Sequence, residues 1–300
     1  MIVHAQEQQR REDSLSEPTP RDQREHDLTT RFRKQIWRPF LSVVSRYRMA
    51  QPGDRIAVCL SGGKDSLLLA LCMRTLKKYS TVPFEVVYLS MDPGYSPDNR
   101  ARVLAAARSL GISPEVFDTD IYQVVDTVDT SPCHVCAAMR RGYLYKEAQK
   151  RGCNRIALGH HRDDAAETIL LSILYGGQFS AMLPRLKSEN YPGMELIRPL
   201  YEVRERAIRN WLATTGITPI TCACRVTRSR DGGKRARVKR LLAMLEAEQP
   251  NIVDNIIASS DRVNLATLLG YRDGLDAPVT TLMDRLGEGI QKADFVDRLF

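Results

Sequence analysis

The 300-residue sequence lacks long apolar runs, and no stretch approaches the roughly 18 consecutive apolar residues that a membrane-spanning helix needs. Its first residues, MIVHAQEQQRREDS, lack the apolar core of a secretory signal, so we expect no such signal. Only 7 cysteines, 18 glycines and 15 prolines are present, which excludes a disulfide scaffold and a collagen-like chain. The 43% apolar and 27% charged residues that remain are typical of a soluble globular protein with one large domain or two.

Acidic residues are almost missing from two stretches of the chain. Lys and Arg outnumber Asp and Glu by 44 to 36, a net charge of +8. Residues 31–48 contain six basic side chains and no acid, and residues 225–240 contain eight with Asp231 alone. A solvated helix face mixes both signs. The two stretches therefore predict a surface that binds a polyanion such as nucleic acid.

Strand-like and helix-like segments alternate through the middle of the chain. Short apolar runs predict strands, and apolar residues at three- and four-residue spacing predict helices. Because no hairpin signals separate the strands, right-handed crossovers and a parallel sheet follow. The fold class predicted is α/β, with an open, mostly parallel, doubly wound sheet. The strands are expected at 55–60, 84–90, 115–117, 155–158 and 196–198, and the helices at 64–79, 99–110, 137–150 and 163–174.

Helical flanks are expected on both sides of this α/β core. Polar residues 1–28 predict a disordered tail, and residues 29–50 a basic helical segment that Pro39 kinks or splits. The α/β domain would occupy residues 51–220. Helices are also expected at 204–215, 235–248 and 252–258. Residues 221–275 would form a basic helical segment that contains two cysteines, and residues 276–300 a second tail.

The first predicted strand leads directly into a glycine-containing loop, Ser61-Gly62-Gly63-Lys64-Asp65-Ser66, and then a helix. Tandem glycines permit close backbone approach to a ligand, and a helix N-terminus attracts anions. The loop is neither a Walker A motif nor a G-x-G-x-x-G fingerprint. A plain strand-to-helix turn is the alternative, but the added Lys, Asp and Ser side chains favour a phosphate site.

Two cysteine pairs form the second chemical signal. Cys133-His134-Val135-Cys136 follows Pro132 at a helix start, and Cys222-Ala223-Cys224 lies far along the chain. Such pairs suit a Cys₄ zinc site or an iron–sulfur cluster with three protein ligands, and the residues alone favour neither. Cys59, Cys72 and Cys153 carry no motif, and the first two lie inside apolar patterns that predict core filler.

A third signal, Gly159-His160-His161-Arg162-Asp163-Asp164, follows the predicted strand at 155–158. The carboxyl ends of parallel strands share one sheet edge, so these side chains should face the phosphate loop. Asp164 or Asp163 could hold Mg²⁺ or a proton. The alternative role for the four residues His160, His161, Asp163 and Asp164 is to cap the helix that follows, as Asp163 could do.

The loop resembles that of the ATP pyrophosphatase superfamily, which splits ATP between its α- and β-phosphates. Four further motifs narrow this resemblance: Cys133-x-x-Cys136-Ala-Ala-Met-Arg-Arg-Gly-Tyr-Leu-Tyr, Ile156-Ala-Leu-Gly-His-His-Arg-Asp-Asp164, Tyr175-Gly-Gly177 and Ile197-Arg-Pro-Leu200. With the loop and these motifs, residues 30–270 resemble the tRNA 2-thiocytidine synthetase family. The Cys-Ala-Cys-Arg sequence at 222–225 is similar to one subgroup. The resemblance implies an adenine nucleotide alpha hydrolase-like fold and a cytosolic, dimeric tRNA thiolase that uses ATP, Mg²⁺ and a [4Fe–4S] cluster.

The resemblance also implies site residues. Catalytic roles fall to Lys64, Asp65, Asp164, Cys133 and Cys136. Cluster ligands would be Cys133, Cys136 and either Cys224, which alignment favours, or Cys222. ATP contacts would come from Ser61, Gly62, Gly63, Lys64, Asp65, Ser66, Met91, Asp92, Gly159, His160, Asp163 and Asp164. The expected RNA contacts are Arg33, Lys34, Arg140, Arg141, Arg225, Lys234, Arg235, Arg237 and Lys239.

Two other functions remain open at this stage. The 2-thiouridine synthetases share the loop and the central C-x-x-C, but they usually carry terminal zinc-finger cysteines that this sequence lacks. A zinc-stabilised protein that binds nucleotide or RNA without catalysis is the other. The thiolase interpretation implies tRNA and a sulfide donor, such as a cysteine desulfurase, as partners.

Overall fold

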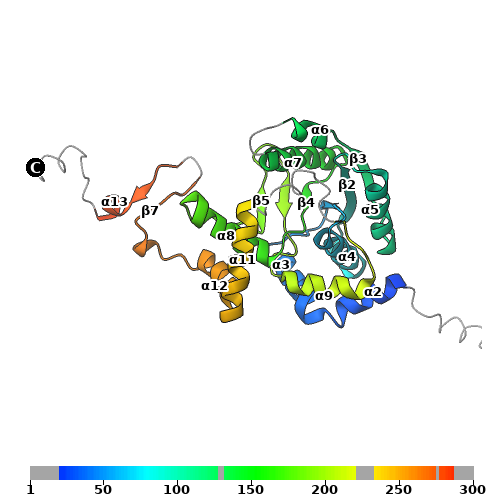
Figure 1. The fold of residues 1–300 in the computed structure, drawn as a ribbon, viewed down its shortest axis with the longest axis horizontal. Coiled ribbons are helices and arrows are strands. Elements are labelled where there is room, and N and C mark those ends of the chain that lie inside the picture. Colours follow the sequence, from blue (N-terminus) through cyan, green and yellow to red (C-terminus); the bar gives the residue numbers. More distant parts are fainter. Residues whose placement is uncertain (1–19, 128–131, 221–232, 275–276, 287–300) are drawn as a thin grey trace, which may run out of the picture. The chain divides into compact units, whose positions relative to one another are not determined.

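The computed structural model describes residues 20–127, 132–220, 233–274 and 277–286 (Figure 1). The chain forms two compact units, which meet between Val253 and Asp254. The first unit contains the sheet predicted from the sequence and every described candidate site residue. Among the helices of the described ranges, none has both the length and the apolarity to cross a membrane.

A six-stranded sheet is the centre of the first unit, with strand order β3-β2-β1-β4-β6-β5. All neighbours are parallel except β5, which runs antiparallel to β6. This confirms the predicted mostly parallel, doubly wound α/β class. The bounds are β1 Arg55–Cys59, β2 Glu85–Asp92, β3 Glu115–Asp118, β4 Arg155–Ala157, β5 Arg185–Lys187 and β6 Glu195–Ile197.

Helices cover both faces of the sheet (Figure 1). The strand order reverses between β1 and β4, so the connection to β4 crosses to the other face. Packing agrees: Ala57 of β1 and Ile156 of β4 lie in one buried cluster with Tyr145 and Ala148 of α7. From β1 to α11, the described helices of this unit are α4 Lys64–Tyr79, α5 Pro97–Ser109, α6 Ile121–Asp126, α7 Pro132–Lys150, α8 Arg162–Gly176, α9 Glu205–Thr215 and α11 Gly233–Glu248.

The N-terminal segment is more ordered than its composition predicts. A helix, α2 (Pro20–Thr29), occupies the end of the stretch expected to be a disordered tail, so residues 20–28 correct that prediction. Two contacts explain the difference. Leu28 is fully buried, and the buried carboxylate of Glu25 accepts hydrogen bonds from Arg74, Lys78 and Tyr79 of α4. Sparse apolar residues thus suffice when a buried ion pair ties the helix down.

Pro39 divides the next helical segment as expected. A π-helical turn, η2 (Arg33–Trp37), precedes α3 (Arg38–Arg46), and Pro39 lies in the first turn of α3, where a missing N–H costs nothing. Phe40 and Val43 of α3 are fully buried. The basic side chains of residues 33 and 34 are exposed.

The second unit contains small elements. Helix α12 (Ile252–Asp261) begins at the end of the first unit and continues into the second. A 3-10 turn η3 (Leu265–Thr267), a two-residue antiparallel ladder of β7 (Gly270–Tyr271) and β8 (Thr280–Thr281), and α13 (Leu282–Leu286) follow. Residues 280–286 fall in the stretch expected to be a tail, and they form a strand and a helix.

Candidate functional site

The phosphate loop, defined as Ser61–Ser66, connects β1 to α4 at the carboxyl edge of the sheet. Gly62 has φ +77°, and a Cβ there would lie 2.8 Å from side-chain carbons of Val103 and Ile220. The Ser66 hydroxyl donates to the Gly63 carbonyl at 2.9 Å and accepts from the Ser61 N–H at 3.2 Å. The Ser66 hydroxyl therefore links both ends of the loop, and α4 begins at Lys64.

A second turn, at the end of β4, packs directly on this loop. A Cβ on Gly159 would lie 3.0 Å from the carbonyl carbon of Asp65 and 3.1 Å from the Ser66 nitrogen, both backbone atoms. Only glycine allows this approach without a shift of the loop. Gly159 thus brings the His160–Asp164 turn against the start of α4.

His161, not Asp163, caps helix α8. The His161 Nδ1 accepts from the Asp164 N–H at 3.4 Å, and the Asp164 carboxylate accepts from the His161 N–H at 3.1 Å, which forms a capping box. Capping of α8, the alternative role for these four residues, is therefore confirmed for His161 and Asp164 and wrong for Asp163. Asp163 instead caps α9: its carboxylate accepts from the Glu205 N–H at 2.6 Å and pairs with Arg204 at 3.0 Å. Burial raises the pKa of Asp163, but these hydrogen bonds outweigh burial and lower it.

Three carboxylates meet at His161, which is 3% exposed. Its ring nitrogens lie 3.7 Å from Asp65, 3.7 Å from Asp163 and 3.5 Å from Asp164. The Oδ1 of Asp65 is buried and has no hydrogen-bond partner among the described residues. No group of three or more His, Cys, Asp or Glu in the described ranges could hold a metal alone. A magnesium ion bound by one or two carboxylates plus substrate phosphates fits this arrangement.

Lys64 is held by two acids. Its Nζ lies 3.0 Å from Asp65 and 3.1 Å from Glu205, the first residue of α9. Burial lowers the pKa of Lys64, but the Asp65 and Glu205 carboxylates raise it by more. The pKa is therefore raised overall, and the ammonium stays charged. Glu205 lies outside every motif of the sequence. The one signal for it in the sequence is its position. An acidic residue that begins a helix after a strand lies at the same edge of the sheet as the phosphate loop.

His160 faces the other side of the turn. The Arg198 Nε donates to its Nδ1 at 3.4 Å. Burial, and then the Arg198 charge, lower the pKa of His160 to about 4, so its ring is neutral at neutral pH. Arg198, also missed by the sequence analysis, lies directly after β6 and follows the same sheet-edge logic as Glu205.

The end of β2 supports the site through packing. Met91 lies in an apolar cluster with Ile121 and Val125, and Cys136 of α7 packs against it. The Asp92 carboxylate accepts from the Gly94 and Tyr95 N–H groups at 2.9 and 2.7 Å and pairs with Arg100 at 3.1 Å. The carboxylate thus shapes the turn after β2.

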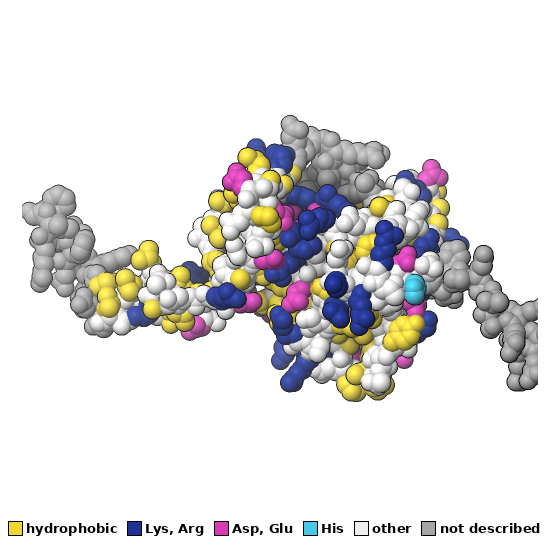
Figure 2. Space-filling model, turned by 90° about the horizontal axis from the view of Figure 1, so that it is seen from below, with side chains coloured by type: hydrophobic (Ala, Val, Ile, Leu, Met, Phe, Trp, Pro, Cys, Tyr) yellow, Lys and Arg dark blue, Asp and Glu magenta, His cyan; other side chains and the backbone are white. Residues whose placement is uncertain are grey.

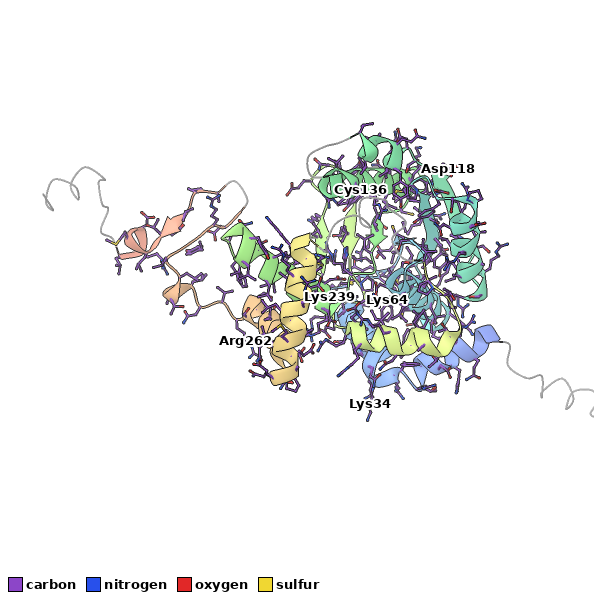
Figure 3. The ribbon with its side chains drawn as sticks, in the orientation of Figure 1. Lys34, Lys64, Asp118, Cys136, Lys239 and Arg262 are labelled. Carbon is purple, nitrogen blue, oxygen red and sulfur yellow. The ribbon has the colours of Figure 1, made fainter. Side chains whose placement is uncertain are left out.

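The cysteines fall into two classes. Cys72 and Cys153 are buried, and burial raises the pKa of all three motif-free thiols, that of Cys59 to about 12, so they stay neutral. Cys136 is half-buried near the start of α7 (Figure 3). Cys133 lies one turn earlier in that helix, but its side chain is outside the described residues, as are Cys222 and Cys224.

Two of the candidate RNA contacts lie on the site itself. From α11, Arg235 approaches Asp164 at 3.7 Å and Glu167 at 3.8 Å, and Lys239 pairs with Glu205 at 2.7 Å. Of the remaining candidates, Arg225 lies outside the described residues, Lys234 stacks over Tyr175 at 5.1 Å, Arg140 is half-buried, and Arg33, Lys34, Arg141 and Arg237 are exposed. Figure 2 shows Lys and Arg side chains gathered on one face of the first unit.

A cavity of about 510 Å³ opens beside these residues, between α8, α9 and α11. Its lining includes Asp163, Glu167, Arg204, Glu205, Lys239 and Leu242. Burial, and then the neighbouring Asp164, raise the pKa of Glu167 to about 7. The cavity wall therefore mixes ion pairs with a carboxyl group that exchanges its proton near neutral pH.

Comparison with known proteins agrees with this geometry. The model of the PP-loop domain family matches residues 28–222. The tRNA-cytidine(32) 2-sulfurtransferase of Geobacter sulfurreducens is 37% identical over 75% of this chain and 88% of its own. That of Alkalilimnicola ehrlichii is 33% identical over 84% of both. In fold, the chain is similar to the U34-tRNA thiolase NcsA from Methanococcus maripaludis, solved with its [4Fe-4S] cluster. The TM-score is 0.61 at 19% identity, covering 75% of this chain and 77% of that one.

Proposed function

Because the chain belongs to the PP-loop family, together with the tRNA-cytidine(32) 2-sulfurtransferases, we propose that it is an ATP-dependent tRNA thiolase. It replaces the C2 oxygen of an anticodon-loop cytidine with sulfur. The single observation that carries the proposal is the position of Lys64 and the unpartnered Asp65 oxygen at a helix N-terminus, beside the Gly159–Asp164 turn. This is the arrangement expected where phosphate charge and a divalent cation meet.

The residues of the loop would act on the triphosphate. The α4 N–H groups and Lys64 attract the β- and γ-phosphates, which depart as pyrophosphate. The cytidine C2 oxygen attacks the α-phosphate, so a P–O bond forms as the bond to pyrophosphate breaks. A sulfur nucleophile then adds to C2, and AMP leaves with the original oxygen. Asp65 and Asp164 would hold Mg²⁺ against the phosphates.

The chemistry of the two cysteine motifs supports an iron–sulfur cluster. Cys136 is half-buried against an apolar cluster at the end of β2, where thiolate ligands are shielded from water. Ile220, two residues before Cys222, donates its N–H to the Gly62 carbonyl at 3.0 Å, so the chain enters the second cysteine motif from the phosphate loop. Cys133, Cys136 and Cys224 or Cys222 would be the ligands. A [4Fe–4S] cluster held by three cysteines would supply the chemistry that delivers sulfide to C2.

The proposal also includes the partners of the enzyme and its location in the cell. The substrate is tRNA, the sulfur comes from a cysteine desulfurase or another sulfide donor, and the enzyme acts as a homodimer in the cytoplasm. The exposed basic side chains of η2 and α11 are the surface available to phosphates, which position RNA without reading its sequence.

Mass spectrometry of tRNA nucleosides from a deletion strain tests the reaction. We expect 2-thiocytidine to disappear and to return with the wild-type gene but not with Lys64→Met or Cys136→Ala. Cys153→Ala, a buried thiol without a motif, is the matched control and should restore it. Unchanged 2-thiocytidine, or loss of 2-thiouridine instead, would contradict the proposal.

Metal analysis of anaerobically purified protein tests the cluster. Wild-type protein should be brown and contain iron and acid-labile sulfide, and Cys133→Ala should be colourless. Comparison of Cys222→Ala with Cys224→Ala identifies the third ligand, because only the ligand's loss removes iron. Stoichiometric zinc without iron would instead support a zinc-stabilised protein.

A further inference from the structure

Glu205 receives three cations from three helices. Its carboxylate lies 3.1 Å from Lys64 of α4, 2.9 Å from Arg209 of α9 and 2.7 Å from Lys239 of α11. The side chain is only 10% exposed, so these pairs are largely shielded from solvent. Figure 3 shows that Lys64 and Lys239 come from helices far apart in the sequence. Glu205 thus contacts both α11 and the phosphate loop, through Lys239 and Lys64.

The charges around Glu205 indicate why its carboxylate has three cationic partners. Lys64 is shared by Asp65 and Glu205, two acids that would cancel its charge and compete with phosphate. With Arg209 and Lys239 added, the five side chains carry a net charge of +1. Without Lys239 the net charge is zero, and Glu205 draws more strongly on Lys64. Lys239 therefore keeps Lys64 available to an anion.

The position of Lys239 on α11 supports this role. Lys239 follows Arg235 by four residues, so both lie on the helix face turned to α8 and α9, and Val238 and Leu242 of the same helix are buried. Arg240, the next residue, is exposed and has no ion pair with the described residues. Helix α11 therefore carries two neighbouring cations in different surroundings: Lys239 is paired with Glu205, and Arg240 is exposed to solvent.

We propose that Glu205 and Lys239 are positioning residues for Lys64: Glu205 orients the ammonium toward the phosphates, and Lys239 offsets the Glu205 charge. This rests on the proposed function of the loop in binding ATP. Through this chain of contacts, the basic helix α11 sets the strength of the ATP site. Neither residue touches the phosphates.

Calorimetric titration with α,β-methylene ATP and Mg²⁺ tests the proposal on the full chain without RNA. Lys239→Met should raise the dissociation constant about fivefold. Arg240→Met removes the same charge from the same helix and should change it less than twofold. In a Glu205→Gln background, Lys239→Met should have no further effect, because Lys239 acts only through Glu205.

Glu205→Gln alone has a second signature. It removes both an anchor and a competing charge from Lys64, so the KM for ATP should change less than threefold. The kcat for AMP formation with tRNA and sulfide should fall about tenfold, because the ammonium loses its orientation. Glu205→Asp keeps the charge and should restore part of that rate, which a merely structural role does not predict.

Three outcomes would overturn the proposal. Equal effects of Lys239→Met and Arg240→Met would assign Lys239 to general surface charge. A Lys239→Met effect that persists beside Glu205→Gln would show that Lys239 acts on its own. An unchanged kcat in Glu205→Gln would remove Glu205 from the site. Should wild-type protein bind no α,β-methylene ATP, the proposed function itself fails, which is a different result.

Discussion

Gly159 is the residue that joins two turns of the site. A methyl group there would lie 3.0–3.1 Å from three backbone atoms of Asp65 and Ser66, which cannot rotate away. We expect Gly159→Ala to weaken the binding of α,β-methylene ATP at least tenfold and to cost about 1–3 kcal/mol of stability. Gly233→Ala, where no atom of the described residues lies within 4 Å, is the control and should leave binding unchanged. Normal binding by Gly159→Ala would mean that the loop shifts freely.

Glu167 predicts a pH dependence of stability. Burial and Asp164 raise its folded pKa to about 7 from an ordinary 4.5. The unfolded chain therefore loses this proton first, and the stability that the group contributes at low pH is lost as the pH rises through 7. Glu167→Gln stays neutral, so at pH 8 it should be more stable than wild type by roughly 2 kcal/mol, and at pH 5 by much less.

Urea denaturation at pH 5 and pH 8 measures this difference. The neighbouring Arg235, 3.8 Å away, and Lys239 partly stabilise the ionised form, so the gain is smaller than an isolated buried acid would give. An equal effect of the substitution at both pH values would mean that Glu167 is ionised throughout.

The sequence predicted the residues of motifs better than their partners. The loop Ser61–Ser66 and the turn Gly159–Asp164 meet at one sheet edge, as parallel strands require. Glu205 was missed because it belongs to no motif, and Arg198 was missed because its motif, Ile197-Arg-Pro-Leu200, gave that residue no role. Only the folded sheet brings them to Lys64 and His160. The role of Asp163 also depended on a distant helix, which local capping rules do not reveal.

At the scale of elements, one carboxylate connects two helices. Asp163 belongs to α8 but caps α9 through the Glu205 N–H and Arg204. We expect Asp163→Ala to lower the unfolding free energy by about 2 kcal/mol, because the helix loses its cap and Arg204 loses a partner. Asp98→Ala, an exposed acid in the first turn of α5, should cost less than about 0.5 kcal/mol.

Chemical denaturation of both variants gives the comparison. Because α9 begins with Glu205, the Asp163 variant should also reduce the affinity for α,β-methylene ATP, whereas Asp98→Ala should not. Equal stability of the two variants would show that α9 needs no cap from α8.

Helices and strands with a strong periodic pattern of apolar residues were predicted from the sequence. Elements that are short, or that an ion pair holds in place, were not. The strands of the parallel sheet and helices α4, α8, α9 and α11 lie within a few residues of their expected bounds. The three-residue β5 and the six-residue α6 are too short for a periodic signal. Helix α2 was missed because Glu25, not an apolar face, holds it on α4.

At the scale of the molecule, the positive charge of α11 divides between the site and solvent. Arg235 and Lys239 contact acids of α8 and α9, while Arg237 is exposed. Arg237→Ala should therefore weaken tRNA binding without a change in base preference, and reduce the slope of log affinity against log salt by about 1. Arg235→Ala should instead reduce the rate of AMP formation more than tRNA affinity. Filter binding from low to high salt measures the affinities and their salt slopes, and the release of AMP measures the rate.

One outcome would contradict this division of the α11 charges between the site and solvent. If Arg235→Ala and Arg237→Ala reduce the salt slope equally and leave the rate alone, both side chains bind phosphates. The excess charge near residues 225–240 was visible in the sequence, but its division was not, because it depends on which helix face packs.

The contact of Ile220 with Gly62 has a consequence for how the protein is made. The first strand and the phosphate loop leave the ribosome early, but the loop gains this contact, and the Lys64 anchor on Glu205, only after residues 205–220 have been synthesised. Such distant pairings form late in folding. A nascent or truncated chain that stops before residue 205 lacks both contacts. The protein would therefore acquire its nucleotide site at nearly the same moment as the chain reaches its second cysteine motif.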